Sequence, residues 1–252
     1  MEYINRIRVG SSSPLLKTNL GTISKAIYDG VGFYDNEEPT PAPLYTEVTE
    51  VKMTNPGNQT LATNPVFFNT GVVVPNDQKI YCEAVFTHYA TNYGCNFGLN
   101  DHVSGMPSQF YRFFTPYGYL MWDYYNSRKS NRTYPSVGTT YDIHFGYDSS
   151  NLKGFLDLAT HGGTFERKMD NVSFGSYNWP SNGNKFLVCI TAIGIRNCQL
   201  YTDSSKGTLL FDGIAVLDNN NTPCMYDKVS DQFLYLENPA STSQYGTITY
   251  IE

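Results

Sequence analysis

Short β-strand signals follow one another along most of the chain, and they restrict the fold more than any other feature of the sequence. Each signal is a run of β-branched and aromatic residues or an alternation of apolar and polar residues. The clearest runs are 78–86, 109–114, 118–125, 140–148, 152–159, 185–194 and 207–218. Turn-forming residues separate them, as at 148–151 and 218–221. Because no long stretch keeps a helical period, the sequence predicts an all-β, two-sheet antiparallel jelly-roll sandwich.

The stretch PCMYDKVSDQFLY, residues 223–235, is typical of a β-hairpin, because alternating strands enter and leave a short polar turn. We expect this hairpin to close the jelly roll by pairing terminal strands and so removing free sheet edges. Tyr226 and Phe233 are predicted to pack inward, and Asp227 or Asp231 to support the turn. The hairpin holds no obvious catalytic group, so its predicted role is structural.

A proline-rich segment divides the chain near its start. Proline stands at alternate positions within the sequence PTPAP, which favours an extended, polyproline-like spacer. The sequence therefore predicts a small β-rich N-terminal module at 1–36, a spacer at 37–43 and the jelly roll at 44–252. A domain of the last size can bury a sizeable core, whereas the first module is too small to be firmly stable alone.

The N-terminal module contains a weak repeat. RIRVG at 6–10 and KAIYDG at 25–30 each read as a short strand that ends in a glycine turn. Two interpretations stay open: the module anchors or oligomerises the protein by pairing strands with another chain, or it packs on its own jelly roll. Under the first interpretation, the apolar contacts come from Ile7, Val9, Ile27 and Tyr28.

Composition excludes several classes of partner. The 252 residues carry a net charge of −6 and a pI near 5.2, so nucleic acid is not expected to bind. No segment reaches the ~18 consecutive apolar residues of a membrane helix, so membrane insertion is not expected either. The start of the chain lacks the apolar run of a secretory signal peptide.

The cysteines and histidines predict no metal or cofactor. Five cysteines are an odd number without C-x-x-C spacing, so we interpret them as small buried hydrophobes of a protein made in a reducing cytoplasm. The four histidines never stand at ligand spacing. Asp/Asn/Ser clusters at 148–151 and 218–221 could offer oxygens to Ca²⁺, but such clusters are far more often plain turns.

Catalytic patterns are absent from the sequence. In retaining glucanases on jelly-roll scaffolds, a strand with the pattern E-x-D-x-x-E holds the two catalytic carboxylates about 5 Å from each other. No glutamate after the spacer of this chain stands in that pattern. There is also no G-x-S-x-G elbow and no phosphate-binding G-x-x-x-x-G-K-[ST] loop. We therefore expect no enzyme activity, with a divergent glycosidase as a remote alternative.

The segment 109–135 is unusually aromatic. Along 118–125, alternation places Tyr119 and Tyr125 on one strand face and Trp122 and Tyr124 on the other. One interpretation is that one set fills the core and a loop covers the other. The other is an exposed aromatic surface beside basic residues, which would contact a glycan or a neighbouring subunit. The candidate contact residues are Tyr117, Tyr119, Trp122, Tyr124 and Arg128.

Several motifs taken together carry a family resemblance. The final hairpin, with its polar turn followed by P-x-M-Y-D-K-V-x-D-x-F-x-Y, resembles the end of laminin-G-like (concanavalin-A-like) jelly rolls in bacteriophage structural proteins. FFNTGVVVPNDQKIYCEAVF at 67–86 is similar to the opening of that domain. TTYDIHFGYD at 139–148 and CQLYTDSSKGTLLFDGIAVLD at 198–218 fall where the family has its middle and late strands. The chain departs from the family at DNNNTPCMY, just before the last hairpin.

The N-terminal module adds to this resemblance, because a [KR]-x-I-x-x-G unit followed by a Pro-Thr-Pro linker is similar to the leader of fibre and appendage proteins from phages of gut bacteria. The resemblance implies a non-enzymatic virion structural protein (a head or tail fibre, decoration or appendage) assembled in the bacterial host cytoplasm. Its implied partners are other virion proteins and further copies of itself, with host-surface glycans as a further partner. The alternative is a carbohydrate-binding adhesin or host-receptor lectin.

Overall fold

The structure is a computed structural model of the 252-residue chain, and parts of the chain are described. The described residues are 25–28, 31–35, 45–56, 66–75, 79–90, 94–100, 107–113, 120–124, 127–131, 135–173, 185–237 and 245–252. The contacts of the chain divide it into two units, Met1–Pro43 and Leu44–Glu252.

The described residues of the first unit form an antiparallel pair of strands. β1 (Lys25–Tyr28) pairs with β2 (Val31–Asp35), with a register shift between Ala26 and Ile27. The strand predicted from KAIYDG is therefore confirmed, whereas RIRVG lies outside the described residues. The independent folding of this unit and its role in assembly stay predictions.

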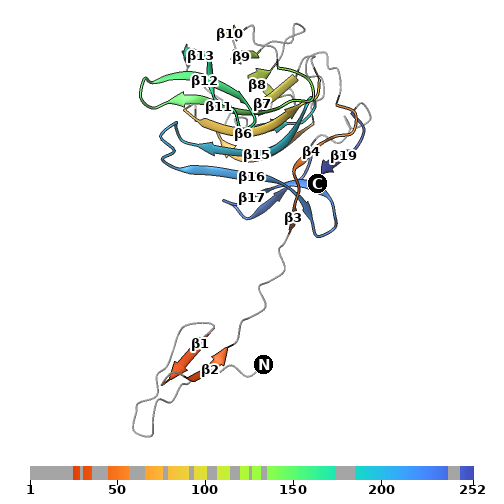
Figure 1. Ribbon diagram of the computed structural model, residues 1–252. Coiled ribbons are helices and arrows are strands. Elements are labelled where there is room, and N and C mark those ends of the chain that lie inside the picture. The colour runs from red at the N-terminus through yellow and green to blue at the C-terminus, as the bar shows by residue number, and fades with distance from the viewer. Residues whose placement is uncertain are drawn as a thin grey trace. The chain divides into compact units, whose positions relative to one another are not determined.

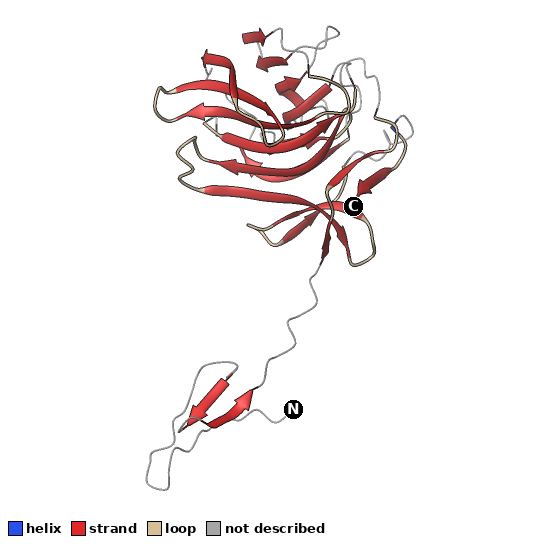
Figure 2. Cartoon of the chain, in the orientation of Figure 1, coloured by secondary structure: helices blue, strands red, loops and turns tan. Residues whose placement is uncertain are grey.

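The described part of the second unit is built from two antiparallel sheets, and strands dominate it (Figures 1 and 2). Its strands are β3 (Tyr45–Glu47), β4 (Glu50–Met53), β5 (Phe67–Val73), β6 (Tyr81–His88), β7 (Gly94–Asn100), β8 (Pro107–Phe113), β9 (Leu120–Tyr124), β10 (Ser127–Asn131), β11 (Thr140–Asp148), β12 (Lys153–Thr160), β13 (Glu166–Val172), β14 (Lys185–Cys189), β15 (Ile193–Tyr201), β16 (Leu209–Asp218), β17 (Pro223–Asp227), β18 (Gln232–Leu234) and β19 (Ile248–Ile251).

The two sheets differ in size. The large sheet has the order β13-β12-β11-β6-β15-β16-β17-β18. Three further strands extend it: β3 pairs with β16, β4 pairs with β15, and β19 pairs with β4. The small sheet has the order β10-β9-β8-β7-β14-β5. Figure 1 shows β12, β11, β6, β15 and β16 of the large sheet one below another. The predicted all-β, two-sheet jelly-roll sandwich is confirmed.

The core lies between the sheets, and aromatic rings from both of them meet there. Phe86 and Phe145 come from the large sheet, and Phe97 and Phe186 from the small one. The ring centroid of Phe97 lies 6.4 Å from that of Phe86, 5.2 Å from that of Phe145 and 6.2 Å from that of Phe186. Such tilted aromatic pairs add about 0.5–1.5 kcal/mol each beyond the area they bury. All four side chains are fully buried.

One predicted strand is split in the structure. The sequence predicts a single strand at 185–194, because this stretch is almost continuously apolar. Instead, β14 ends at Cys189 in the small sheet, and β15 begins at Ile193 in the large sheet. A continuous apolar run is equally compatible with two short strands buried in two sheets, so composition alone does not reveal the crossing point.

The final hairpin forms as β17 and β18, and Asp227 supports its turn. The Asp227 carboxylate accepts hydrogen bonds from the backbone N–H groups of Asp212, Val229 and Ser230 at 2.9–3.1 Å. Asp231 also contributes, since it accepts a hydrogen bond from the hydroxyl of Tyr226. The prediction that aspartates hold this turn is confirmed.

Tyr226 is buried as predicted, with Phe233 packed against its cluster, but the two side chains do not enter the main core between the sheets. Met225 enters the main core, so alternation turns Tyr226 to the opposite face of the sheet. There it packs in a second, smaller cluster with Phe233 and with Tyr45, whose ring centroid lies 4.4 Å away. The hairpin is not the last element of the large sheet, since β19 follows it in the chain and pairs with β4.

The surroundings of four cysteines are described, and all four are buried: Cys82, Cys189, Cys198 and Cys224. This confirms their interpretation as small buried residues. Burial raises the pKa of the Cys224 thiol to about 12, so this group is not a reactive thiolate at neutral pH. Among the residues that the structure describes, no helix has the length and apolar character needed to span a membrane.

Candidate functional site

A row of polar side chains crosses the outer face of the large sheet, which is the face turned away from the core. Adjacent strands place these residues directly opposite one another, so that each is the register partner of the next. In order from β13 to β16, this polar row consists of Arg167, Asp157, His144, Glu83, Gln199 and Asp212.

Alternation along each strand explains why these polar groups face outward. On β6, Glu83 stands between Cys82 and Ala84, both of which belong to the main core. On β11, His144 stands between the core residues Ile143 and Phe145. Since successive strand residues point to opposite faces, burial of the apolar residues commits the polar ones to the outer face.

An aromatic row runs beside the polar row. Phe155, Gly146, Tyr81 and Tyr201 are register partners across β12, β11, β6 and β15. The ring centroid of Tyr81 lies 5.9 Å from that of Phe155 and 6.1 Å from that of Tyr201. Gly146 separates the strands that carry Tyr81 and Phe155, and the absence of a side chain there lets the two rings approach each other.

Gly146 is also required by the backbone at this position. Its φ is +130°, and a Cβ atom would lie 2.2 Å from the carbonyl oxygen of Ile80. Real Cβ atoms do not come that close to backbone oxygen, and side-chain-bearing residues rarely adopt this conformation. The aromatic row therefore depends on a glycine.

Glu83 is the centre of a hydrogen-bonded group. Its carboxylate accepts hydrogen bonds from the hydroxyl of Tyr81 at 2.7 Å and from the ammonium group of Lys206 at 2.8 Å. Burial opposes ionisation of Glu83, but these hydrogen bonds outweigh it and lower the pKa of the carboxyl group. Burial lowers the pKa of the neighbouring His144, although the charge of Glu83 counteracts it, so the imidazole is neutral at pH 7.

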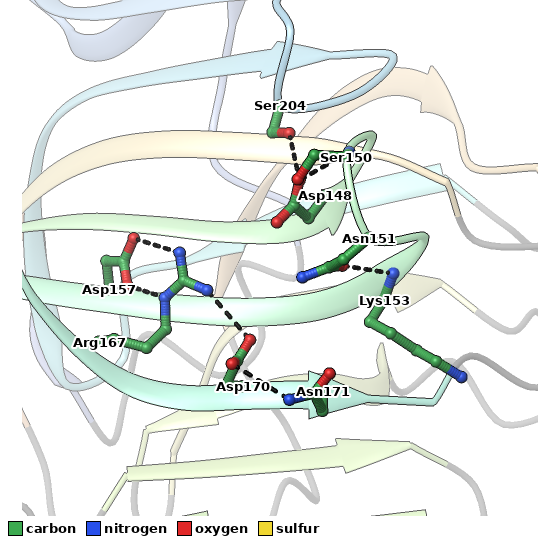
Figure 3. Close-up of polar contacts among 9 residues, drawn as sticks. All are labelled: Asp148, Ser150, Asn151, Lys153, Asp157, Arg167, Asp170, Asn171 and Ser204. Atoms are coloured by element: carbon green, nitrogen blue, oxygen red, sulfur yellow. Dashed lines mark hydrogen bonds and ion pairs between the residues drawn. The ribbon is translucent and has the colours of Figure 1, made fainter.

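Phe165 forms an exposed platform over the polar row. Its ring stacks on that of His144 with a centroid distance of 3.9 Å and an interplanar angle of 25°, and 38% of the residue is exposed. Arg167 lies beside it, with its guanidinium group 4.3 Å from the ring centroid of Phe155. Figure 3 shows the same guanidinium held by Asp157 and Asp170.

Two loops border the aromatic row. The turn after β11 and the loop after β15 are joined because the backbone N–H of Ser204 donates to the carbonyl of Tyr147 at 3.1 Å. The Ser204 hydroxyl also donates to Asp148 at 3.3 Å, as Figure 3 shows. This fixed loop carries Lys206, whose ammonium group lies 5.5 Å from the ring centroid of Tyr201. We call the polar row, the aromatic row, Phe165 and Lys206 together the outer-face site.

In the Asp/Asn/Ser clusters at 148–151 and 218–221, the aspartate carboxylates stabilise the turns themselves. Asp148 accepts hydrogen bonds from the backbone N–H and hydroxyl of Ser150, and Asp218 accepts them from the backbone N–H groups of Asn220 and Thr222. Burial opposes ionisation of Asp148, but its hydrogen bonds lower the pKa of the carboxyl group. Within the described ranges, no three His, Cys, Asp or Glu side chains converge in a way that could hold a metal ion.

A second polar cluster has a structural role. Glu50 on β4 is fully buried, and its carboxylate accepts hydrogen bonds from the hydroxyls of Thr87 and Tyr89, the latter at 2.6 Å. Arg196 approaches the same carboxylate at 3.7 Å and donates to Thr140 at 3.0 Å. These residues lie on β4, β6, β11 and β15, and Tyr89 directly follows β6. The cluster therefore connects β4 to the centre of the large sheet.

Three of the residues predicted from the aromatic segment belong to the small sheet. Trp122 and Tyr124 lie on β9 and Arg128 lies on β10, in a hairpin that pairs Trp122 with Lys129 and Arg128 with Asp123. Tyr117 and Tyr119 lie outside the described residues. The role of this segment in glycan or subunit contact stays a prediction.

The predicted anchoring residues are described in part. Ile27 and Tyr28 lie on β1, opposite Gly32 and Val31 of β2. Ile7 and Val9 lie outside the described residues. Their role in assembly also stays a prediction.

Sequence reasoning missed the outer-face site. Its members come from six strands and two loops, and none stands in a recognisable motif. Alternation in 81–88 and 140–148 indicates that Glu83 and His144 share a face with other polar residues of their own strands. It does not indicate that the two residues lie opposite each other, because that depends on the register between strands.

No family model matches the chain, and no curated protein matches it. Several solved structures are similar to it, including the following two. One is the native heptameric SAP-like pentraxin from Limulus polyphemus, at 14% identity over 63% of this chain and 78% of that chain, with a TM-score of 0.39. The other is a candidate carbohydrate-binding protein from Bacteroides ovatus ATCC 8483, at 11% identity over 82% of this chain, with a TM-score of 0.38. The chain spans 61% of the Bacteroides protein, and at these identities neither similarity extends to function.

Proposed function

We propose that the protein is a non-enzymatic binding protein whose jelly roll contacts glycans through the outer-face site. The observation that carries this proposal is the polar row lying on one sheet face with the exposed ring of Phe165 and the partly exposed rings of His144 and Tyr201. Hydroxyl-rich sugars need donors and acceptors in one plane and a flat apolar surface for the ring face, and this arrangement supplies both.

The electrostatics of the site favour binding over hydrolysis. A glycosidase needs one carboxyl group that keeps its proton at working pH beside a second that is ionised. Hydrogen bonds lower the pKa of Glu83, and Asp157 is held by Arg167. Both carboxylates therefore act as hydrogen-bond acceptors in this proposal, and the lowered pKa of Glu83 does not suit a general acid.

A glycan array with the purified full-length protein tests this function. We expect binding to at least one glycan, and a Phe165→Ala variant should bind at least fivefold more weakly, a loss of about 1 kcal/mol. Tyr250→Ala is the matched control, because Tyr250 is 37% exposed on β19 and lies outside the outer-face site. Failure to bind any glycan, or release of sugar products from one, would contradict the proposal.

The second proposed function concerns where the protein works: a virion structural protein that presents this jelly roll as part of a phage fibre, decoration or appendage. Its support is the sequence resemblance, together with an N-terminal unit that contains the short β1–β2 pair. Two short strands leave backbone groups at their edges that can pair with another chain. Oligomerisation through this unit would multiply weak contacts.

Mass spectrometry of purified particles tests the virion role, and absence of the chain from particles would overturn it. Deletion of residues 1–36 tests the anchor. We expect the truncated protein not to join particles and to lose its oligomeric state in light scattering. If it assembles as well as the full chain, the aromatic segment 109–135 becomes the preferred interface, and Trp122→Ala is the variant that tests it.

A further inference from the structure

We infer that the outer-face site takes an uncharged oligosaccharide of several rings, lying across the strands, and disfavours acidic glycans. This inference rests on the proposed glycan-binding function and adds the length and the charge of the ligand. Three features of the described residues carry it: the extent of the polar row, the pairing of its cations and the position of its flat surfaces.

The extent of the row sets the length of the ligand. The polar row crosses from β13 through β12, β11, β6 and β15 to β16. Neighbouring strands lie about 4.8 Å apart, so five such steps span roughly 24 Å. The length of the row is therefore several times that of a single sugar ring. A ligand that used the whole row would therefore be a chain of linked rings perpendicular to the strands.

The charges set its class. The site holds two cations, and both are already neutralised: Lys206 by Glu83 at 2.8 Å, and Arg167 by Asp157 and Asp170. Asp212 at the end of the row accepts a hydrogen bond from the neutral amide of Gln199 at 2.9 Å. A carboxylate or sulfate on the ligand would meet this uncompensated negative charge, and both cations of the outer-face site already have carboxylate partners. The exposed Lys153 begins β12 at the edge of the same face, on the far side of the aromatic row from the polar row.

A further carboxylate lies beside the row. Asp142, on the same strand and face as His144, accepts hydrogen bonds from His161 at 2.6 Å and from the backbone N–H of Gly162 at 2.9 Å. These acceptors suit hydroxyl groups, which donate a proton and bring no charge. The ring of Phe165, which stacks on the imidazole of His144, supplies the flat surface against which a sugar ring packs.

Isothermal titration calorimetry with the full-length protein tests the inference. The probes are neutral oligosaccharides of one to six rings derived from glucan, mannan, galactan and chitin, and oligogalacturonides of the same lengths. We expect the affinity for a neutral series to rise at least tenfold between one and four rings. An acidic series should bind at least tenfold more weakly at low salt, with a gap that narrows as salt is added.

Two variants sharpen the test. Asp212→Asn removes one negative charge and nearly preserves the shape, so it should improve binding of the acidic series relative to the neutral one. Tyr250→Ala should change neither. Equal or tighter binding of acidic oligosaccharides, or a single ring bound as tightly as six, would overturn this inference and leave glycan binding intact. Failure of every glycan on the array and in both series would instead overturn the proposed function.

Discussion

His88 makes the stability of the jelly roll depend on pH in a way that can be calculated. It is the last residue of β6, and none of its surface is exposed. Its backbone is held on one side by Thr139 and Gly138 and on the other by its register partner Ile193. Burial lowers the pKa of its imidazole from 6.5 to about 4, because the charged form loses its hydration.

The size and sign of the effect follow from these two pKa values. They differ by about 2.5, and each pKa unit corresponds to 1.36 kcal/mol, so the total is about 3 kcal/mol. Above pH 6.5, His88 is neutral in both states and contributes no pH dependence. As the pH falls from 6.5 to 4, the unfolded chain binds a proton that the native state does not. Stability is therefore lost across that window, and the loss levels off below pH 4.

Urea unfolding of the full-length protein and of a His88→Gln variant, at intervals from pH 7.5 to 4, measures this effect. Carboxylates titrate in both proteins, so the informative quantity is the difference between the two curves. We expect wild type to lose about 3 kcal/mol more than the variant over this range. Val229→Ala is the control, because that exposed side chain carries no titratable group, and its curve should run parallel to that of wild type. Parallel curves for wild type and His88→Gln would refute the reasoning.

Three further outcomes are expected. Gly146→Ala should lower the free energy of unfolding by about 3 kcal/mol, because the new Cβ would approach the backbone closely and φ is strained. Gly162→Ala should lower it by only about 1 kcal/mol, because a Cβ there meets nothing within 4 Å. Equal losses for the two variants would contradict the packing argument. Asp227→Ala should cost about 2 kcal/mol in the same assay, since it leaves backbone N–H groups without their acceptor, and an unchanged denaturation midpoint would refute that role. Residues 44–252 should melt cooperatively by circular dichroism, and a cooperative melt of a monomeric 1–36 peptide would contradict the predicted dependence of that module on a partner.

Local pattern was enough to predict most of the strands. The predicted run at 140–148 coincides with β11, and the run at 152–159 differs from β12 by a single residue at each end. The final hairpin and its supporting aspartate were also predictable, because turn chemistry is local. The polar strand β13 was missed, since its sequence ERKMDNV shows little alternation and commits few side chains to the core.

The outer-face site was decided by tertiary structure. His144 and Glu83 are far apart in the chain, and they become neighbours because β11 pairs with β6 in one particular register. A shift of that register by one residue would place a core residue opposite Glu83. The sequence by itself therefore determines that this protein is an all-β sandwich, since alternation and turn residues act within a few positions. Which polar residues stand in one row is set by pairing between distant strands, and that pairing is determined by burying the two inner faces against each other.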